Sequence, residues 1–179
     1  MNAIDLLVKQ HQEAKDLLAS LEDAEVEDKD ELFEKLADAL AVHAAIEERH
    51  FYPATKDDRT EELLQEAVEE HLSVKRLIAD LLDMPPSDAQ FDAKVKVLKE
   101  QVEHHIEEEE GELFPKVKKA HSSQELEDLG VTLADASRGG SAGFGRGAFE
   151  ERAALGANKL RGSLEWVGHP CPPGESPES

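Results

Sequence analysis

The chain has 179 residues, enough for one domain with a hydrophobic core but too few for two domains of ordinary size. It carries 41 acidic and 20 basic residues, so its formal net charge of −21 argues against nucleic acid or a membrane surface as a partner. The single cysteine cannot form an intramolecular disulfide. No apolar run approaches the roughly 18 residues of a membrane span. We therefore expect a cytoplasmic protein.

Four segments have apolar residues at helical spacing. They cover residues 2–22, 30–56, 60–83 and 88–120. The third must end near Met84, because the two prolines after it cannot continue a helix. Short connections favour antiparallel neighbours. The sequence therefore predicts an all-α fold, an up-down-up-down four-helix bundle with a flexible C-terminal tail.

The composition divides the chain into three parts. Residues 1–120 form the predicted bundle. Ser122 and Glu125 have the spacing of a helix cap, which predicts a short extra helix over 121–136. Residues 137–179 are rich in glycine, serine and proline, which is typical of a low-complexity, disordered tail.

A duplicated motif connects the two halves of the predicted bundle. Each half has one histidine on its first helix and a His-x-x-x-Glu-Glu sequence on its second. The offset between the halves is about 60 residues for both helices. The residues concerned are His11, His43, Glu47, His71, His105 and Glu109.

These six residues continue the leucine stripes of their helices, so the pattern points them into the core. Burying an unpaired carboxylate costs several kcal/mol or more, whereas a bound cation would take the lone pairs of both residue types. A purely structural bundle with hydrogen-bonded core histidines is the alternative. The repetition of the whole set in both halves favours a metal centre.

Over about residues 3–118 this pattern resembles the hemerythrin HHE cation-binding family. The resemblance implies a non-haem centre of two iron ions, completed by an oxo or hydroxo bridge. Iron suits imidazole and carboxylate ligands, as manganese or zinc does less often. The implied ligands are His11 and His43 for one iron, His71 and His105 for the other, and Glu47 and Glu109 as bridges.

The sequence departs from the oxygen carriers of this family at one position. They place a second histidine four residues after the first on the third helix, where this chain has Lys75. An iron ion would then have an open position or an additional ligand. His50, Tyr52 and Glu48 are the alternatives for that ligand. Glu110 is rotated by about 100° from its neighbour and is expected to face solvent.

Two functions remain open at this stage. The centre could bind oxygen, nitric oxide or peroxide as a sensor or carrier. Alternatively, it could belong to an enzyme that decomposes peroxide or oxidises nitric oxide. The sequence does not identify whether the chain has a protein partner.

Overall fold

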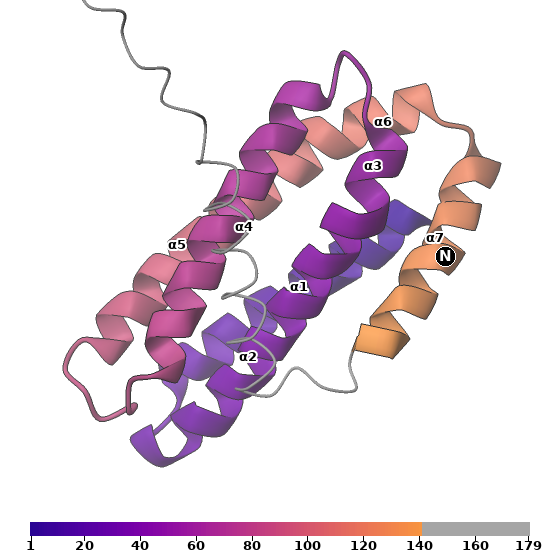
Figure 1. The fold of residues 1–179 in the computed structure, drawn as a ribbon. Helices are drawn as coiled ribbons and strands as arrows, with labels where there is room; N and C mark the ends of the chain where they lie inside the picture. Colours follow the sequence, from indigo (N-terminus) through magenta and orange to yellow (C-terminus); the bar gives the residue numbers. More distant parts are fainter. Residues whose placement is uncertain (141–179) are drawn as a thin grey trace, which may run out of the picture.

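The computed structural model describes residues 1–140, and this part of the chain contains helices and no strand. The predicted all-α fold is confirmed. Four long helices form its frame (Figure 1): α1 (Ala3–Asp23), α2 (Val26–Ile46), α4 (Glu61–Leu82) and α5 (Phe91–Glu108). The tail predicted for 137–179 lies, from residue 141 onward, outside the described residues.

The second and fourth predicted segments each contain a π-helix that the sequence did not indicate. Helix α2 continues through η1 (Glu47–Phe51) into α3 (Tyr52–Thr55). In the same way, α5 continues through η2 (Glu109–Leu113) into α6 (Phe114–Ala120). A π-turn inserts one residue, which rotates the residues after it by about 100°. Both insertions begin at the glutamate of the duplicated motif.

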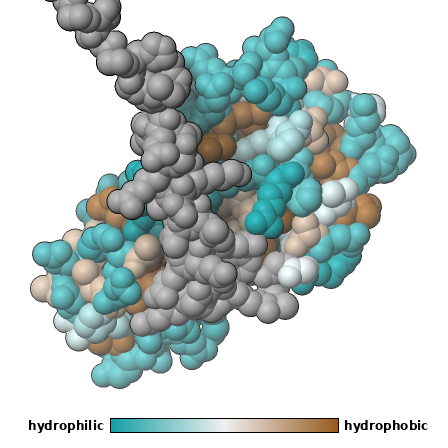
Figure 2. All heavy atoms as spheres, in the orientation of Figure 1, coloured by the Kyte–Doolittle hydropathy of each residue, from teal (hydrophilic) through white to brown (hydrophobic). Residues whose placement is uncertain are grey.

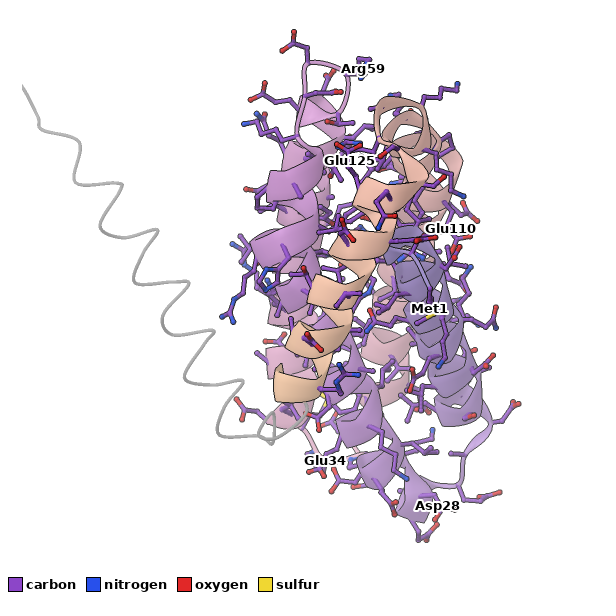
Figure 3. The ribbon with its side chains drawn as sticks, turned by 90° about the vertical axis from the view of Figure 1, so that its right-hand side faces the viewer. Met1, Asp28, Glu34, Arg59, Glu110 and Glu125 are labelled. Carbon is purple, nitrogen blue, oxygen red and sulfur yellow. The ribbon has the colours of Figure 1, made fainter. Side chains whose placement is uncertain are left out.

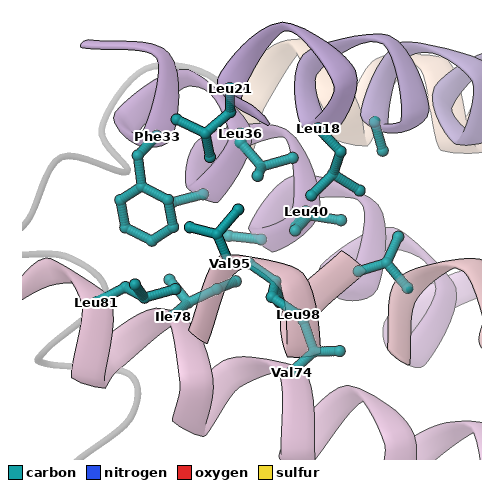
Figure 4. Packing of buried hydrophobic residues seen from close by; sticks show 14 of the residues in the cluster. Leu18, Leu21, Phe33, Leu36, Leu40, Val74, Ile78, Leu81, Val95 and Leu98 are labelled. Carbon is teal, nitrogen blue, oxygen red and sulfur yellow. The ribbon is translucent and has the colours of Figure 1, made fainter. Parts of the chain in front are cut away.

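The helices pack as two hairpins that close on each other. Helix α1 packs against α2 and α4 against α5, with further contacts between α1 and α5 and between α2 and α4. Leucine, valine and isoleucine side chains from all four helices fill the core near the helix connections (Figure 4). A second apolar cluster surrounds the π-helices. The buried histidines and glutamates lie between these two clusters.

A further helix, α7 (Ser123–Gly140), packs against α1 and α2. It buries Leu126 and Leu133 in the second cluster, and Figure 3 shows it running beside Met1. Close approach explains Gly130, because a Cβ there would lie 2.6 Å from the carbonyl oxygen of Met1. The helix extends to Gly140, beyond the extra helix predicted for 121–136.

The surface of the described helices is mainly polar. Figure 2 shows hydrophilic residues over most of one face, with hydrophobic ones in smaller groups between them. Among the described residues, the large hydrophobic ones that are exposed are Met1 and five valines at separate positions. Within residues 1–140, no helix is both long and apolar enough to cross a membrane.

Candidate metal centre

The structure brings all six predicted site residues together in one buried layer. Each long helix contributes one histidine, and each π-helix contributes its first residue, a glutamate. None of the six is more than 7% exposed. The residues are His11 on α1, His43 on α2, Glu47 on η1, His71 on α4, His105 on α5 and Glu109 on η2.

The Nε2 atoms of the histidines face the two carboxylates. Glu47 Oε2 lies 3.1 Å from Nε2 of His43 and 3.3 Å from Nε2 of His71. Glu109 Oε2 lies 3.2 Å from Nε2 of His11 and 3.7 Å from Nε2 of His105. The donor atoms form two groups, each within 4.8 Å: His11, His43, Glu47 and Glu109, and Glu47, His71 and His105. Two cations sharing Glu47 would fit this arrangement.

Several of these buried atoms lack a hydrogen-bond partner. They are the Nε2 atoms of His11 and His43, Oε1 of Glu47 and Oε2 of Glu109. His11 Nε2 and Glu109 Oε2 lie close together, yet they do not form a hydrogen bond. Leaving such groups buried and unpaired costs about 1–3 kcal/mol each. Metal ions would take these lone pairs, so the donor set fits a cation better than a structural network.

In each of the four histidines of the layer, the Nδ1 atom contacts a side chain of another helix. Nδ1 of His11 lies 2.8 Å from Glu110 Oε1, and Nδ1 of His43 lies 3.0 Å from Gln10 Oε1. Nδ1 of His71 lies 3.0 Å from Glu48 Oε1, and Nδ1 of His105 lies 2.8 Å from Glu70 Oε2. An Nδ1–H that donates outward leaves the Nε2 lone pair directed inward. This is the tautomer that a metal ligand requires.

The prediction that Glu110 is exposed is confirmed, but the prediction missed a contact that Glu110 makes with the buried layer. Its side chain is 37% exposed, but the carboxylate reaches across to His11 on a different helix. Helical phase alone cannot identify such a contact, because it depends on how two helices pack. The Glu-Glu doublet in both halves was the available signal, since Glu48 has the same role toward His71.

The three alternatives for an additional ligand occupy different places. Glu48 contacts the outer edge of His71 and the ammonium of Lys75, away from the Nε2 atoms. His50 is partly exposed and does not join the donor groups, because the π-turn places Phe51 in the inward position instead. Tyr52 is buried, and its hydroxyl donates to Glu109 Oε1 at 3.0 Å. Only Tyr52 reaches the two glutamates.

A cavity of about 30 Å³ lies against the four histidines. That volume holds about two water-sized molecules. Apolar side chains of the first core cluster, including Ala14, Val74 and Ile78, form most of its remaining wall. Lys75 also lines it, so the position four residues after His71 opens onto this cavity. Neither Glu47 nor Glu109 is among the lining residues.

Burial and neighbouring charges shift the pKa values of buried histidines and glutamates in the layer. Burial and the charge of His11 lower the pKa of His43 well below its usual range. Burial and the charge of Glu109 raise the pKa of Glu47 well above its usual range. Burial opposes ionisation of Glu109, but its contact with His11 and the charge of His105 keep its pKa low. In the metal-free protein, Glu47 therefore takes up a proton more readily than Glu109 does.

Burial alone would lower the pKa of both His11 and His105. For His11, the contact with Glu109 and the charge of Glu47 outweigh burial, and the pKa is raised. For His105, the hydrogen bond to Glu70 and the charge of Glu109 have the same effect. Protons and metal ions would therefore compete most strongly for these two imidazoles.

Known proteins resemble the chain across the bundle. The family model "Hemerythrin HHE cation binding domain" matches residues 2–117. Rv2633c of Mycobacterium tuberculosis H37Rv, an uncharacterized protein, is 29% identical over 137 residues, which are 75% of this chain and 84% of that protein. A DNA nickase of Nostoc sp. PCC 7120 is 29% identical over 128 residues, which are 71% of this chain. The match spans only 36% of the nickase.

A solved structure agrees in fold as well. It is the crystal structure of a hemerythrin HHE cation binding domain-containing protein, the Rv2633c homolog from Mycobacterium kansasii. The two chains are 28% identical and superpose with a TM-score of 0.67. The alignment covers 90% of this chain and 93% of the other.

Proposed function

Because the chain belongs to the hemerythrin HHE cation-binding family, we propose that its buried layer holds two iron ions and binds a small ligand. The ligand would be oxygen, nitric oxide or peroxide, and the protein would act as a sensor or carrier. One observation carries this proposal. The Nε2 atoms and the carboxylates face one another with several donor atoms unpaired, while every Nδ1 is held from outside.

The proposed ligands correspond to the two donor groups. His11 and His43 would hold one iron, and His71 and His105 the other. Glu47, which belongs to both groups, and Glu109, which contacts His11 and His105, would bridge them. An oxo or hydroxo bridge completes the proposed centre. We also propose that the four long helices follow an up-down-up-down order. The proposed location is the cytoplasm, which the low cysteine content of the chain supports.

The cavity supports a small ligand. When bound, the iron pair would supply redox chemistry and open positions for that ligand. The chain itself would supply a largely apolar wall that excludes bulk water, and Lys75 at the position where the family's oxygen carriers have a histidine. About 30 Å³ admits a molecule of two or three heavy atoms and rejects larger substrates.

One observation favours the enzymatic alternative. Burial and the charges of Glu47 and Glu109 raise the pKa of Tyr52 well above its usual range, so its hydroxyl keeps its proton. The hydroxyl directs that proton at Glu109, where peroxide decomposition or nitric oxide oxidation could use it. We do not extend DNA nicking from the Nostoc relative, because the match covers 36% of it and a charge of −21 disfavours DNA.

Optical spectroscopy of the iron-loaded protein tests the proposal. The reduced protein would be prepared without oxygen, and its spectrum recorded before and after oxygen, nitric oxide or peroxide is added. A stable, reversible spectral change supports a sensor or carrier. Repeated consumption of peroxide or nitric oxide supports the enzyme instead. An iron-loaded protein whose spectrum responds to none of the three would contradict both.

A further inference from the structure

Two cavities flank the buried layer, and they differ in the residues that line them. The cavity against the four histidines is mostly apolar, and Lys75, which also lines it, has its ammonium paired with Glu48. A second cavity, of about 10 Å³, is lined by three glutamates, by His105 and by three apolar side chains. Glu70 and Glu108 belong to its outer part, since both are partly exposed, whereas His105 and Glu109 are buried.

A third group of possible metal ligands lies at the outer part of this second cavity. His104 Nε2 is 3.5 Å from Glu70 Oε1 and 3.4 Å from Glu108 Oε1. The three donor atoms lie within 4.8 Å of one another. The other oxygen of Glu70 is 2.8 Å from His105 Nδ1. One carboxylate therefore connects the exposed imidazole of His104 with a histidine of the buried layer.

We propose that Glu70, His104 and Glu108 form a surface site that receives a divalent cation and delivers it to His105 and Glu109 through the second cavity. The inference rests on the proposed metal centre. It gives that centre an entry route, which a site with ligands no more than 7% exposed requires. Oxygen and imidazole donors at the surface suit Fe²⁺ and related ions, and no change of oxidation state is needed during delivery.

Two further observations support this route over the other cavity. Glu109 lines the second cavity, and its Oε2, which faces the histidines of the layer, has no hydrogen-bond partner. The residue that would receive the cation therefore borders this route. The surroundings of the surface site are also strongly acidic. Glu66, Glu70 and Glu112 all lie near enough to Glu108 for their negative charges to act on its carboxylate. Such a field attracts cations, whereas the wall of the first cavity is mostly apolar and its lysine is already paired with Glu48.

The rate of metal loading tests the inference. Metal-free protein would be mixed with Co²⁺, which is not oxidised during the measurement, and its absorption followed by stopped flow. The double variant His104→Gln/Glu108→Gln should load about tenfold more slowly than the wild type, but to the same final metal content. Both side chains lie at the surface, and circular dichroism would verify that the helices are retained.

Two control variants locate the effect. Glu107→Gln removes the same charge from an exposed neighbouring position and should load at the wild-type rate. Lys75→Gln should also leave the rate unchanged. Three results would overturn the entry route: an unchanged rate in the double variant, an equal slowing by Glu107→Gln, or marked acceleration by Lys75→Gln. A wild type that takes up no Co²⁺ would instead overturn the metal centre itself.

Discussion

Tyr52 and Phe114 occupy equivalent positions in the two repeats, and each ring stacks on a histidine of the buried layer. The Tyr52 ring lies 5.8 Å from that of His71 at an interplanar angle of 18°. The Phe114 ring lies 5.8 Å from that of His11 at 6°. The packing is thus duplicated, but the hydroxyl is not. Only one side of the centre has a phenol that donates to a glutamate.

Tyr52→Phe isolates the effect of that hydroxyl, because it retains the ring and its stacking. The change leaves Oε1 of Glu109 without its donor. The free energy of unfolding of the metal-free protein should fall by about 1–3 kcal/mol in urea denaturation. Metal content should not change, since the ligands stay in place. An unaltered unfolding midpoint would mean that the hydrogen bond does not form in solution.

Glu110→Ala should weaken metal binding although Glu110 is not proposed as a ligand. It removes the acceptor that holds Nδ1 of His11, and loss of such an acceptor costs about 10–100-fold in metal affinity. Competition with a chelator would measure this loss. Glu107→Ala is the control, because it lies on the same helical path and is exposed. Equal affinities in the two variants would contradict the assigned contact.

Lys75→His tests the open position beside the first cavity. An imidazole there, four residues after His71, should occupy the place of the histidine that the family's oxygen carriers have. The oxygen adduct should become longer-lived and any peroxide turnover slower, since reaction at a metal needs an open position. Lys15→His provides the control, because Lys15 comes after His11 by the same spacing but does not line the cavity. Identical behaviour of both variants would show that Lys75 does not control access.

Metal affinity should fall as the pH falls. His11 and His105 have raised pKa values in the metal-free fold, so protons occupy these imidazoles at a higher pH than they occupy a free imidazole. His43 has a lowered pKa and remains neutral there, so it adds no competition in this range. Titration of the apparent dissociation constant between pH 8 and pH 5 should therefore show weakening from about neutral pH downward. A constant affinity over this range would exclude imidazole ligands.

The sequence predicted the helices and the membership of the buried layer, because both depend on local periodicity. His11 and His43 lie in phase with leucines of their own helices, so no knowledge of packing was needed. The duplicated motif supplied the remaining members. These predictions required only the 3.6-residue period of a helix.

The rest depended on features that periodicity does not contain. The π-turns at Glu47 and Glu109 shift the helical phase of the residues after them, so His50 leaves the inward face and Tyr52 enters the layer. The contacts of Gln10 and Glu70 with histidine Nδ1 atoms join different helices. Pairings of that kind depend on tertiary packing, and a single sequence does not specify them.

Metal analysis of the purified protein tests the central claim most directly. After anaerobic reconstitution with Fe²⁺ and removal of unbound metal, the wild type should retain about two iron ions per chain, one for each donor group. Glu47→Gln should retain far less, because Glu47 belongs to both groups. A folded wild type that retains no iron, or a Glu47→Gln variant that retains the full amount, would contradict the account.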